Sequence, residues 1–220
     1  NFLKKIKQQQ KIKFENPCWN FKLDHIKPYA FWENAFTKTE CESIIKIAKK
    51  KGLIKGMSGA TLQDYINNKD SRQSKICWLY ASDDMEWVFR KVTDIVLNLN
   101  KQFFQFDLFG LSEGLQFTNY LAPSDKFKKH IDRNINFPVR KLSISIQLTD
   151  PEKYEGGELI LYNNEKGDVV NKEQGTLILF PSFLLHEVTP ITKGERNSLV
   201  SWVTGNNFKH IPGSGITIKD

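Results

Sequence analysis

Residues 141–148, KLSISIQL, alternate strictly between apolar and polar side chains. In an extended chain the leucines and isoleucines point to one face, and the serines and the glutamine point to the other. This period of two predicts a β-strand that has one face in an apolar core. The stretch therefore indicates a β-structured region, and the neighbouring segments indicate what surrounds it.

Short β-rich segments stand before and after this strand, and Gly, Pro, Asn and Asp separate them. The expected strands cover residues 75–80, 115–121, 158–162, 175–180 and 197–204. Many short strands at close spacing are typical of a β-sandwich or barrel.

Two helices are predicted ahead of most of these strands. Thr39-Glu40-Cys41-Glu42 has the pattern of a capping box, so the first helix is expected to open at Thr39 and to stop at Gly52. The second is expected to open near Asp83-Asp84, where acidic side chains suit the positive end of a helix. Its apolar side chains recur at helical spacing and are expected in the core: Trp87, Val88, Val92, Ile95, Val96, Leu99 and Phe103.

Helices followed by a run of strands predict an α+β, mainly β fold, with the helices supporting a jelly roll, or double-stranded β-helix. The length of 220 residues fits one domain. Within it we expect helical support and the first strands in 1–110, the jelly-roll core in 111–205 and a C-terminal tail in 206–220. The turn-rich stretch 53–72 is expected to be a loop.

The composition indicates a soluble globular protein, with 40% hydrophobic and 26% charged residues. The chain shows no secretory h-region and no apolar run long enough for a membrane span, so a cytoplasmic location is expected. The net charge of +7 comes from lysines spread along the chain, which favours a solvated surface over a nucleic-acid footprint. Three widely spaced cysteines without a CxxC pair indicate free thiols.

Two of the four histidines stand in informative places. His130-Ile131-Asp132 is an HxD sequence, and in an extended segment its imidazole and carboxylate point the same way. His186 is expected at the end of a strand-like run, 176–185, which a sandwich can bring close. Two histidines and one carboxylate on one face of an ion form the facial triad of non-haem iron(II) oxygenases, which leaves positions open for other ligands.

A basic and a phenolic residue accompany this set. Arg196 follows His186 by ten residues at the head of a β-rich run, and a buried arginine could grip a dicarboxylate through its planar fork. Tyr120 precedes His130 by ten residues, on a strand expected to adjoin it, and its hydroxyl could complete the same anion site.

Residues from about 114 to 204 resemble the catalytic core of 2-oxoglutarate oxygenases, in particular the prolyl 4-hydroxylase branch and its bacterial PKHD-type members. The resemblance lies in the order of several motifs. They occur in LQFTNYLAPSDKFKKHIDRN (115–134), RKLSISIQLTDPEKYEGGELILY (140–162) and GTLILFPSFLLHEVTPITKGERNSLVSW (175–202). The first 110 residues resemble the helical support of the family only loosely.

The resemblance implies a role for each matching residue. The iron(II) ligands of the family match His130, Asp132 and His186. Arg196 matches the residue that binds the distal carboxylate of 2-oxoglutarate, Tyr120 matches a tyrosine that assists it, and Ser198 resembles the serine of an R-x-S pair. The implied reaction uses O₂ to hydroxylate a prolyl residue in a peptide or protein, decarboxylates 2-oxoglutarate to succinate, and is supported by ascorbate.

Three positions distinguish branches of the family. Animal and plant prolyl 4-hydroxylases carry lysine where Arg196 stands. Nucleic-acid demethylases carry a second arginine six residues later, where this chain has Trp202. Halogenases lack the carboxylate ligand that Asp132 supplies.

Alternatives to a peptidyl prolyl substrate remain. The same chemistry could act on a free amino acid, a small metabolite or a nucleic-acid base, or the chain could be a non-catalytic jelly-roll binding protein. Substrate contacts are expected outside the triad, from Arg133 and Asn134 at the mouth and from Trp78, Tyr80 and the loop 55–72 as a wall or lid. His25 and His210 are expected at the surface, and no pattern indicates an oligomeric state.

Overall fold

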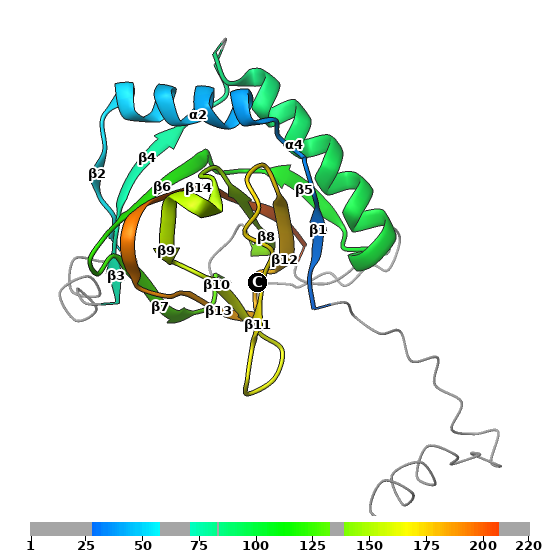
Figure 1. Ribbon diagram of the computed structural model, residues 1–220. Coiled ribbons are helices and arrows are strands. Elements are labelled where there is room, and N and C mark those ends of the chain that lie inside the picture. The colour runs from blue at the N-terminus through cyan, green and yellow to red at the C-terminus, as the bar shows by residue number, and fades with distance from the viewer. Residues whose placement is uncertain (1–27, 58–70, 83, 133–138, 207–220) are drawn as a thin grey trace, which may run out of the picture.

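The structure is a computed structural model that describes residues 28–57, 71–82, 84–132 and 139–206. Two antiparallel sheets face each other, and two helices cover the outer side of the larger sheet (Figure 1). The helices are α2 (Lys38–Lys51) and α4 (Glu86–Leu99). This arrangement confirms the predicted α+β, mainly β jelly roll with helical support.

Most strands of the described residues belong to the larger sheet. Its order is β1 (Ala30–Trp32), β12 (Leu177–Pro181), β8 (Val139–Gln147), β14 (Ile191–Gly205), β6 (Leu115–Leu121), β4 (Lys75–Leu79) and β2 (Ile54–Lys55). The strands β5 (Leu108–Leu111) and β9 (Tyr154–Gly156) also pair with β14. The smaller sheet runs β11 (Asp168–Val169), β10 (Leu159–Tyr162), β13 (Leu185–Val188), β7 (Lys126–His130) and β3 (Arg72–Gln73).

The alternating stretch forms β8 in the middle of the larger sheet. Its leucines and isoleucines belong to the apolar cluster shared with both helices. The serines and the glutamine, Ser143, Ser145 and Gln147, are also buried, but they face the smaller sheet. One face of this strand therefore builds the core, and the other lines an internal cavity.

The first helix begins two residues earlier than its sequence predicts. Thr37 is the N-cap: its hydroxyl accepts a hydrogen bond from the Glu40 N–H at 3.2 Å, and the Glu40 carboxylate accepts one from the Thr37 N–H at 2.7 Å. The prediction of Thr39 was wrong because the run Thr-Lys-Thr-Glu-Cys-Glu contains two overlapping capping-box patterns. With Thr37 as N-cap, Cys41, Ile44 and Ala48 face the core.

The second helix begins later than predicted, at Glu86. The carbonyl of Ser82 accepts hydrogen bonds from the N–H groups of Met85 and Glu86, and this turn buries the Met85 side chain. The helix passes at Leu99 into a π-helical turn, Asn100–Phe104, which leaves Phe103 at 37% exposure. The prediction of Phe103 as a core contact was therefore wrong, whereas Val88, Val92, Ile95, Val96 and Leu99 are buried.

Two further boundaries differ from the sequence expectation. The run 53–72 was expected to be a loop, but Ile54–Lys55 pair with β4 as β2; residues 58–70 lie outside the described residues. The run 176–185 was expected to be one strand, but it divides into β12 and β13 at a turn in which the Leu184 N–H donates to the Pro181 carbonyl. His186 therefore lies on β13, a separate strand in the other sheet.

The pair Gly156-Gly157 shows why its motif requires glycine. Both residues have positive φ, at 73° and 63°. A Cβ on Gly156 would lie 2.1 Å from the Pro190 carbonyl oxygen, and one on Gly157 would lie 2.1 Å from the Ile191 side chain. Only glycine combines this backbone conformation with so close an approach to β14.

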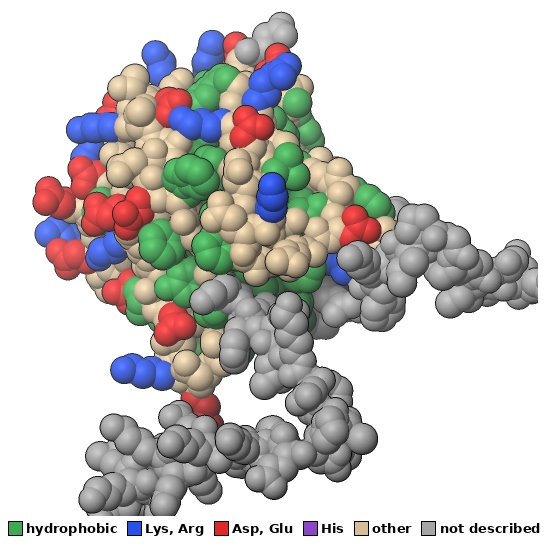
Figure 2. All heavy atoms as spheres, turned by 90° about the vertical axis from the view of Figure 1, so that its right-hand side faces the viewer, with side chains coloured by type: hydrophobic (Ala, Val, Ile, Leu, Met, Phe, Trp, Pro, Cys, Tyr) green, Lys and Arg blue, Asp and Glu red, His purple; other side chains and the backbone are tan. Residues whose placement is uncertain are grey.

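Basic and acidic side chains are mixed on the face shown in Figure 2, where hydrophobic side chains lie between them. Neither described helix is long and apolar enough to cross a membrane. Cys41 and Cys77 are buried free thiols, as expected, and burial raises the pKa of Cys41 to about 12; Cys18 lies outside the described residues.

Candidate metal centre

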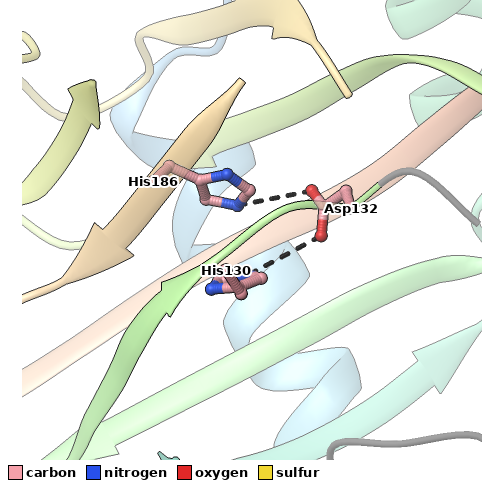
Figure 3. A group of neighbouring side chains, drawn as sticks. All are labelled: His130, Asp132 and His186. Atoms are coloured by element: carbon pink, nitrogen blue, oxygen red, sulfur yellow. Dashed lines mark ion pairs between the residues drawn. The ribbon is translucent and has the colours of Figure 1, made fainter. Parts of the chain in front are cut away.

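The side chains of His130, Asp132 and His186 converge between the two sheets (Figure 3). His130 ends β7 and pairs directly with His186 on β13. The Asp132 carboxylate lies 3.6 Å from Nε2 of His130 and 3.4 Å from Nε2 of His186. One ligand atom from each residue lies within 4.8 Å of the others, so the three side chains surround a position that one metal ion could occupy.

The backbone orients both imidazoles. Nδ1 of His130 lies 2.7 Å from the carbonyl oxygen of Lys128, and Nδ1 of His186 lies 2.9 Å from that of Leu184. A proton on Nδ1 makes these hydrogen bonds and leaves the Nε2 lone pair directed at the shared site. Each histidine thus presents the nitrogen that a metal requires.

The charges of the three groups are coupled. Burial, together with the neighbouring His186, lowers the pKa of His130 to about 4. Burial alone would raise the pKa of Asp132, but the two histidines hold it below its usual range. Burial likewise opposes the charged form of His186, but contact with Asp132 raises its pKa. The pair His186–Asp132 therefore carries the electrostatic coupling, while His130 stays neutral at physiological pH.

Asp132 is also tied to the larger sheet. Its carboxylate accepts a hydrogen bond from the Ser143 hydroxyl at 2.8 Å, and the Ser143 and Ser182 hydroxyls lie 3.0 Å apart. The Asp132 N–H donates to the Ser182 carbonyl at 2.9 Å. These contacts fix a carboxylate that follows the end of β7 and would otherwise have no sheet neighbour.

The three side chains lie in a cavity enclosed by both sheets. Around them the described lining residues are Arg72, Gln116, Thr118, Tyr120, Phe127, Ile144, Ser145, Leu159, Phe180, Val188, Arg196, Ser198, Val200 and Trp202. The surface that faces the cavity is mainly apolar, although polar and charged side chains converge on it, as in sites that bind small molecules.

Arg196 supplies a buried positive charge to this cavity. Its side chain is 2% exposed, and Nη2 donates to the Gln147 side chain at 2.9 Å. The other terminal nitrogen, Nη1, is buried and has no hydrogen-bond partner among the described residues. The Tyr154 hydroxyl is also buried without such a partner, and Arg196 lies close enough to oppose the rise in the Tyr154 pKa that burial causes. The unsatisfied Nη1 of Arg196 indicates an anion site, because an unpaired buried polar group is costly.

The structure places Tyr120 and Ser198 in the same cavity. Tyr120 pairs with Arg196 across β6 and β14, and the guanidinium carbon lies 5.5 Å from the ring centre. The sequence predicted that the strand of Tyr120 adjoins the strand of His130. This prediction was wrong, because the two strands belong to facing sheets. Ser198 is 1% exposed and follows Arg196 on the same face of β14.

Several residues of the site were not predicted. Ser143 and Gln147 occupy polar positions of β8, so the alternation of this strand indicated that their side chains share one face. Tyr154 stands in the motif DPxxYxGGEL. Arg72 ends the loop 55–72 that was expected to form a wall or lid, but nothing in the sequence singled it out, because its place in the cavity depends on how the two sheets meet.

The predicted substrate contacts are only partly described. Trp78 packs on Trp202 with ring centres 6.1 Å apart, and Tyr80 is 59% exposed. Both line a surface cleft together with Phe89 and Glu113. Arg133 and Asn134, and the histidines His25 and His210, lie outside the described residues.

Sequence comparisons agree with this geometry. The family profile described as "2OG-Fe(II) oxygenase superfamily" matches residues 115–204. A PKHD-type hydroxylase of Aliarcobacter butzleri is 31% identical over 178 residues, which cover 75% of this chain and 72% of the relative. A PKHD-type hydroxylase of Prochlorococcus marinus is 36% identical over 52% of its length, and one of Alteromonas mediterranea is 44% identical over 41% of its length.

Solved structures share the fold. A prolyl-4-hydroxylase of Pseudomonas putida superposes with a TM-score of 0.65 at 18% identity, over 82% of this chain and 94% of that one. A prolyl hydroxylase of Trichoplax adhaerens, in complex with a hypoxia inducible factor peptide fragment, gives a TM-score of 0.66 at 19% identity, over 80% and 83%.

Proposed function

Because the chain belongs to the 2-oxoglutarate/Fe(II) oxygenase superfamily, in its prolyl 4-hydroxylase-like branch, we propose that it hydroxylates a prolyl residue in a peptide or protein. Enzymes of this superfamily are dioxygenases that require Fe(II), 2-oxoglutarate and O₂. In this proposal His130, Asp132 and His186 hold the iron, and Arg196 binds the distal carboxylate of 2-oxoglutarate, assisted by Tyr120 and Ser198.

The observation that carries the proposal is the pairing of a metal-ligand set with a buried, unsatisfied arginine in one cavity. Two neutral imidazole nitrogens and a carboxylate form a donor set that suits Fe(II). The unpartnered Nη1 of Arg196 suits a carboxylate, which a guanidinium binds through two hydrogen bonds. The residues present therefore fit both groups.

Bound Fe(II) supplies the redox chemistry, in which O₂ and 2-oxoglutarate are converted to CO₂ and succinate and one oxygen atom enters a substrate C–H bond. The protein positions the participants. His130, Asp132 and His186 would hold the ion, and Arg196 would bind the far end of the cosubstrate. Apolar side chains such as Phe180, Val188 and Val200 keep bulk water out of the cavity.

A prolyl substrate is supported by the names of the relatives. The Aliarcobacter relative is named a PKHD-type hydroxylase, and the two structural neighbours are named prolyl hydroxylases. One of these neighbours is in complex with a peptide fragment.

The proposal is tested by incubating the protein with Fe(II), 2-oxoglutarate, ascorbate and O₂ and with proline-containing peptides, free proline or oligonucleotides. Succinate formation and the gain of one oxygen atom on the substrate are measured by mass spectrometry. We expect a proline-containing peptide to stimulate succinate formation and to gain the oxygen on proline.

Two variants serve as controls. Asp132→Ala removes a proposed ligand and should abolish turnover, while Asp94→Ala removes an exposed carboxylate on α4 and should leave it unchanged. Stimulation by free proline or oligonucleotides alone would contradict the peptide substrate and preserve the oxygenase chemistry. Turnover by Asp132→Ala at the wild-type rate would contradict the ligand assignment.

A further inference from the structure

A second buried arginine lines the cavity. Arg72 lies on the edge strand β3 opposite Phe127, and only 7% of it is exposed. Its guanidinium crosses to the larger sheet, where Nη2 donates to the Gln116 side chain at 2.6 Å, and Nε donates to the Ser74 hydroxyl at 2.9 Å. The guanidinium carbon also lies 4.8 Å from the ring centre of Phe127. These contacts fix a positive charge inside the cavity that contains the metal ligands.

No negative charge among the described residues balances Arg72. Both hydrogen-bond partners, Gln116 and Ser74, are neutral, and none of the ion pairs between described residues includes Arg72. Asp132 is the one carboxylate among the described lining residues, and it belongs to the metal centre. Arginine keeps its proton even when buried, and a buried unpaired cation is costly. The cavity therefore favours an anion from outside.

Arg72 and Arg196 are built alike. Each lines the cavity, and each has one terminal nitrogen bonded to a glutamine side chain, Gln116 or Gln147. Tyr120 lies within the electrostatic influence of both guanidinium groups. Arg196 has an anion assigned to it in the proposed function, the distal carboxylate of 2-oxoglutarate. Nothing is assigned to Arg72.

A charge count identifies which anion is missing. A divalent metal and Arg196 carry three positive charges, and Asp132 and doubly charged 2-oxoglutarate carry three negative ones. These charges cancel before Arg72 is included, so Arg72 leaves one positive charge in the loaded cavity. The two carboxylates of 2-oxoglutarate are already engaged, by the metal and by Arg196. The remaining partner is a singly charged group on the substrate.

We infer that Arg72 binds a carboxylate of the substrate, carried either by an acidic side chain beside the hydroxylated residue or by the C-terminus of the chain. The inference rests on the proposed function for the identity of the site, and it adds the charge of the substrate. The guanidinium of Arg72 is held by two neutral groups, and the N–H groups of a guanidinium form strong, charge-assisted hydrogen bonds to a carboxylate. Arg72 is then a specificity-determining residue.

The test measures peptide binding to protein loaded with Mn(II) and 2-oxoglutarate, in which the cosubstrate is not turned over. The probes are short peptides with aspartate or asparagine beside a central proline, and peptides that end in proline as the free acid or the amide. Matching peptides carry alanine in place of proline. In the wild type we expect one carboxylate peptide to bind about tenfold more tightly than its neutral partner, the gain of a charge-assisted hydrogen bond.

Three variants locate the source of this preference. Arg72→Met removes the charge, and Gln116→Glu keeps Arg72 and its hydrogen bond but supplies an internal carboxylate. In both variants the carboxylate peptide and its neutral partner should bind with about equal affinity. Gln147→Glu makes the same change beside Arg196, and it should weaken 2-oxoglutarate binding while preserving the preference for carboxylate peptides. If Arg72→Met does not fold, Gln116→Glu decides the result.

The outcomes separate this inference from the proposed function. The inference is overturned if wild-type protein shows no preference for carboxylate peptides, or if that preference survives in Gln116→Glu. It is also overturned if the Arg72 and Gln116 variants change only the affinity for 2-oxoglutarate. Preference for the side-chain or the terminal carboxylate identifies the source of the anion. Equal affinity of matching proline and alanine peptides, with the carboxylate preference present in both, would support the role of Arg72 and contradict the prolyl substrate.

Discussion

At the residue scale, the metal centre depends on side chains that hold its ligands as much as on the ligands. Nδ1 of each histidine is bonded to a carbonyl two residues earlier, and Asp132 is bonded to Ser143. Such outer contacts fix the orientation and basicity of metal ligands. The HxD sequence predicted which residues meet, but not what orients them.

Ser143→Ala should weaken metal binding without affecting the fold. The substitution removes the hydrogen bond to the Asp132 carboxylate, and losses of this kind lower metal affinity about tenfold or more. Metal titration of the purified variant checks the affinity. Ser201→Ala is the matched control, because Ser201 lies on the same sheet with a buried hydroxyl that has no partner among the described residues. Equal affinity in Ser143→Ala and Ser201→Ala would contradict a positioning role for Ser143.

Arg196→Met should weaken 2-oxoglutarate binding strongly and leave metal binding close to wild type. The guanidinium is the fixed charge assigned to the distal carboxylate, and losing a charge-assisted pair in a buried site costs roughly 2–3 kcal/mol, or about a hundredfold in affinity. Titration of the metal-loaded variant with 2-oxoglutarate measures the change. An unchanged affinity would mean that the anion binds elsewhere.

At the element scale, periodicity was a reliable guide to the strands and a weaker guide to their ends. The expected strand 115–121 coincides with β6, and the expected strand 141–148 is displaced from β8 by one or two residues. The run 176–185 is interrupted by Pro181-Ser182, a local turn signal, and this is the point at which β12 ends and the chain turns towards β13. Arg72 stands in a two-residue strand, which is too short for any period.

Thr37→Ala should destabilise the protein by about 1 kcal/mol, the usual cost of losing an N-cap hydrogen bond. Thr39→Ala tests the overlapping pattern in the same helix, and it should change the free energy of unfolding by only a few tenths of a kcal/mol. Denaturant unfolding of both variants measures the difference. A larger loss in Thr39→Ala than in Thr37→Ala would contradict the observed helix start.

Glu195→Gln should destabilise the protein in a pH-dependent manner. The Glu195 carboxylate contacts Lys49 on α2 at 2.6 Å and accepts a hydrogen bond from Asn119 at 2.7 Å. Burial alone would raise its pKa, but these contacts outweigh burial and hold the pKa below its ordinary value. Since the pKa is lower in the folded chain, the stabilisation is present above the unfolded pKa and is lost as the pH falls. We expect a loss of about 1 kcal/mol at pH 7, because the pair is partly exposed.

Unfolding of metal-free wild type and Glu195→Gln at pH 7 and near pH 4 measures this effect. The difference between the two proteins should shrink at the lower pH. A difference of the same size at both values would show that Glu195 acts through packing and not through its charge.

At the scale of the whole molecule, the jelly roll divides the proposed reaction between its two sheets. The smaller sheet supplies both histidines, and the larger sheet supplies Arg196, Tyr120 and Ser198. The Asp132 carboxylate joins them through Ser143. The sequence predicted this fold class and the main site residues because both leave local patterns. It included Arg72 only as the end of a loop, 55–72, expected to form a wall or lid, because the position of Arg72 between the sheets arises only when they pack together.

The most direct test of the account is the metal content of the folded protein. Anaerobic titration with Fe(II) in the presence of 2-oxoglutarate should show one equivalent bound by the wild type and by Asp94→Ala, and almost none by Asp132→Ala. Circular dichroism should show the same fold in all three. If folded Asp132→Ala binds one equivalent with wild-type affinity, the metal lies elsewhere and the assignment of His130, Asp132 and His186 is wrong.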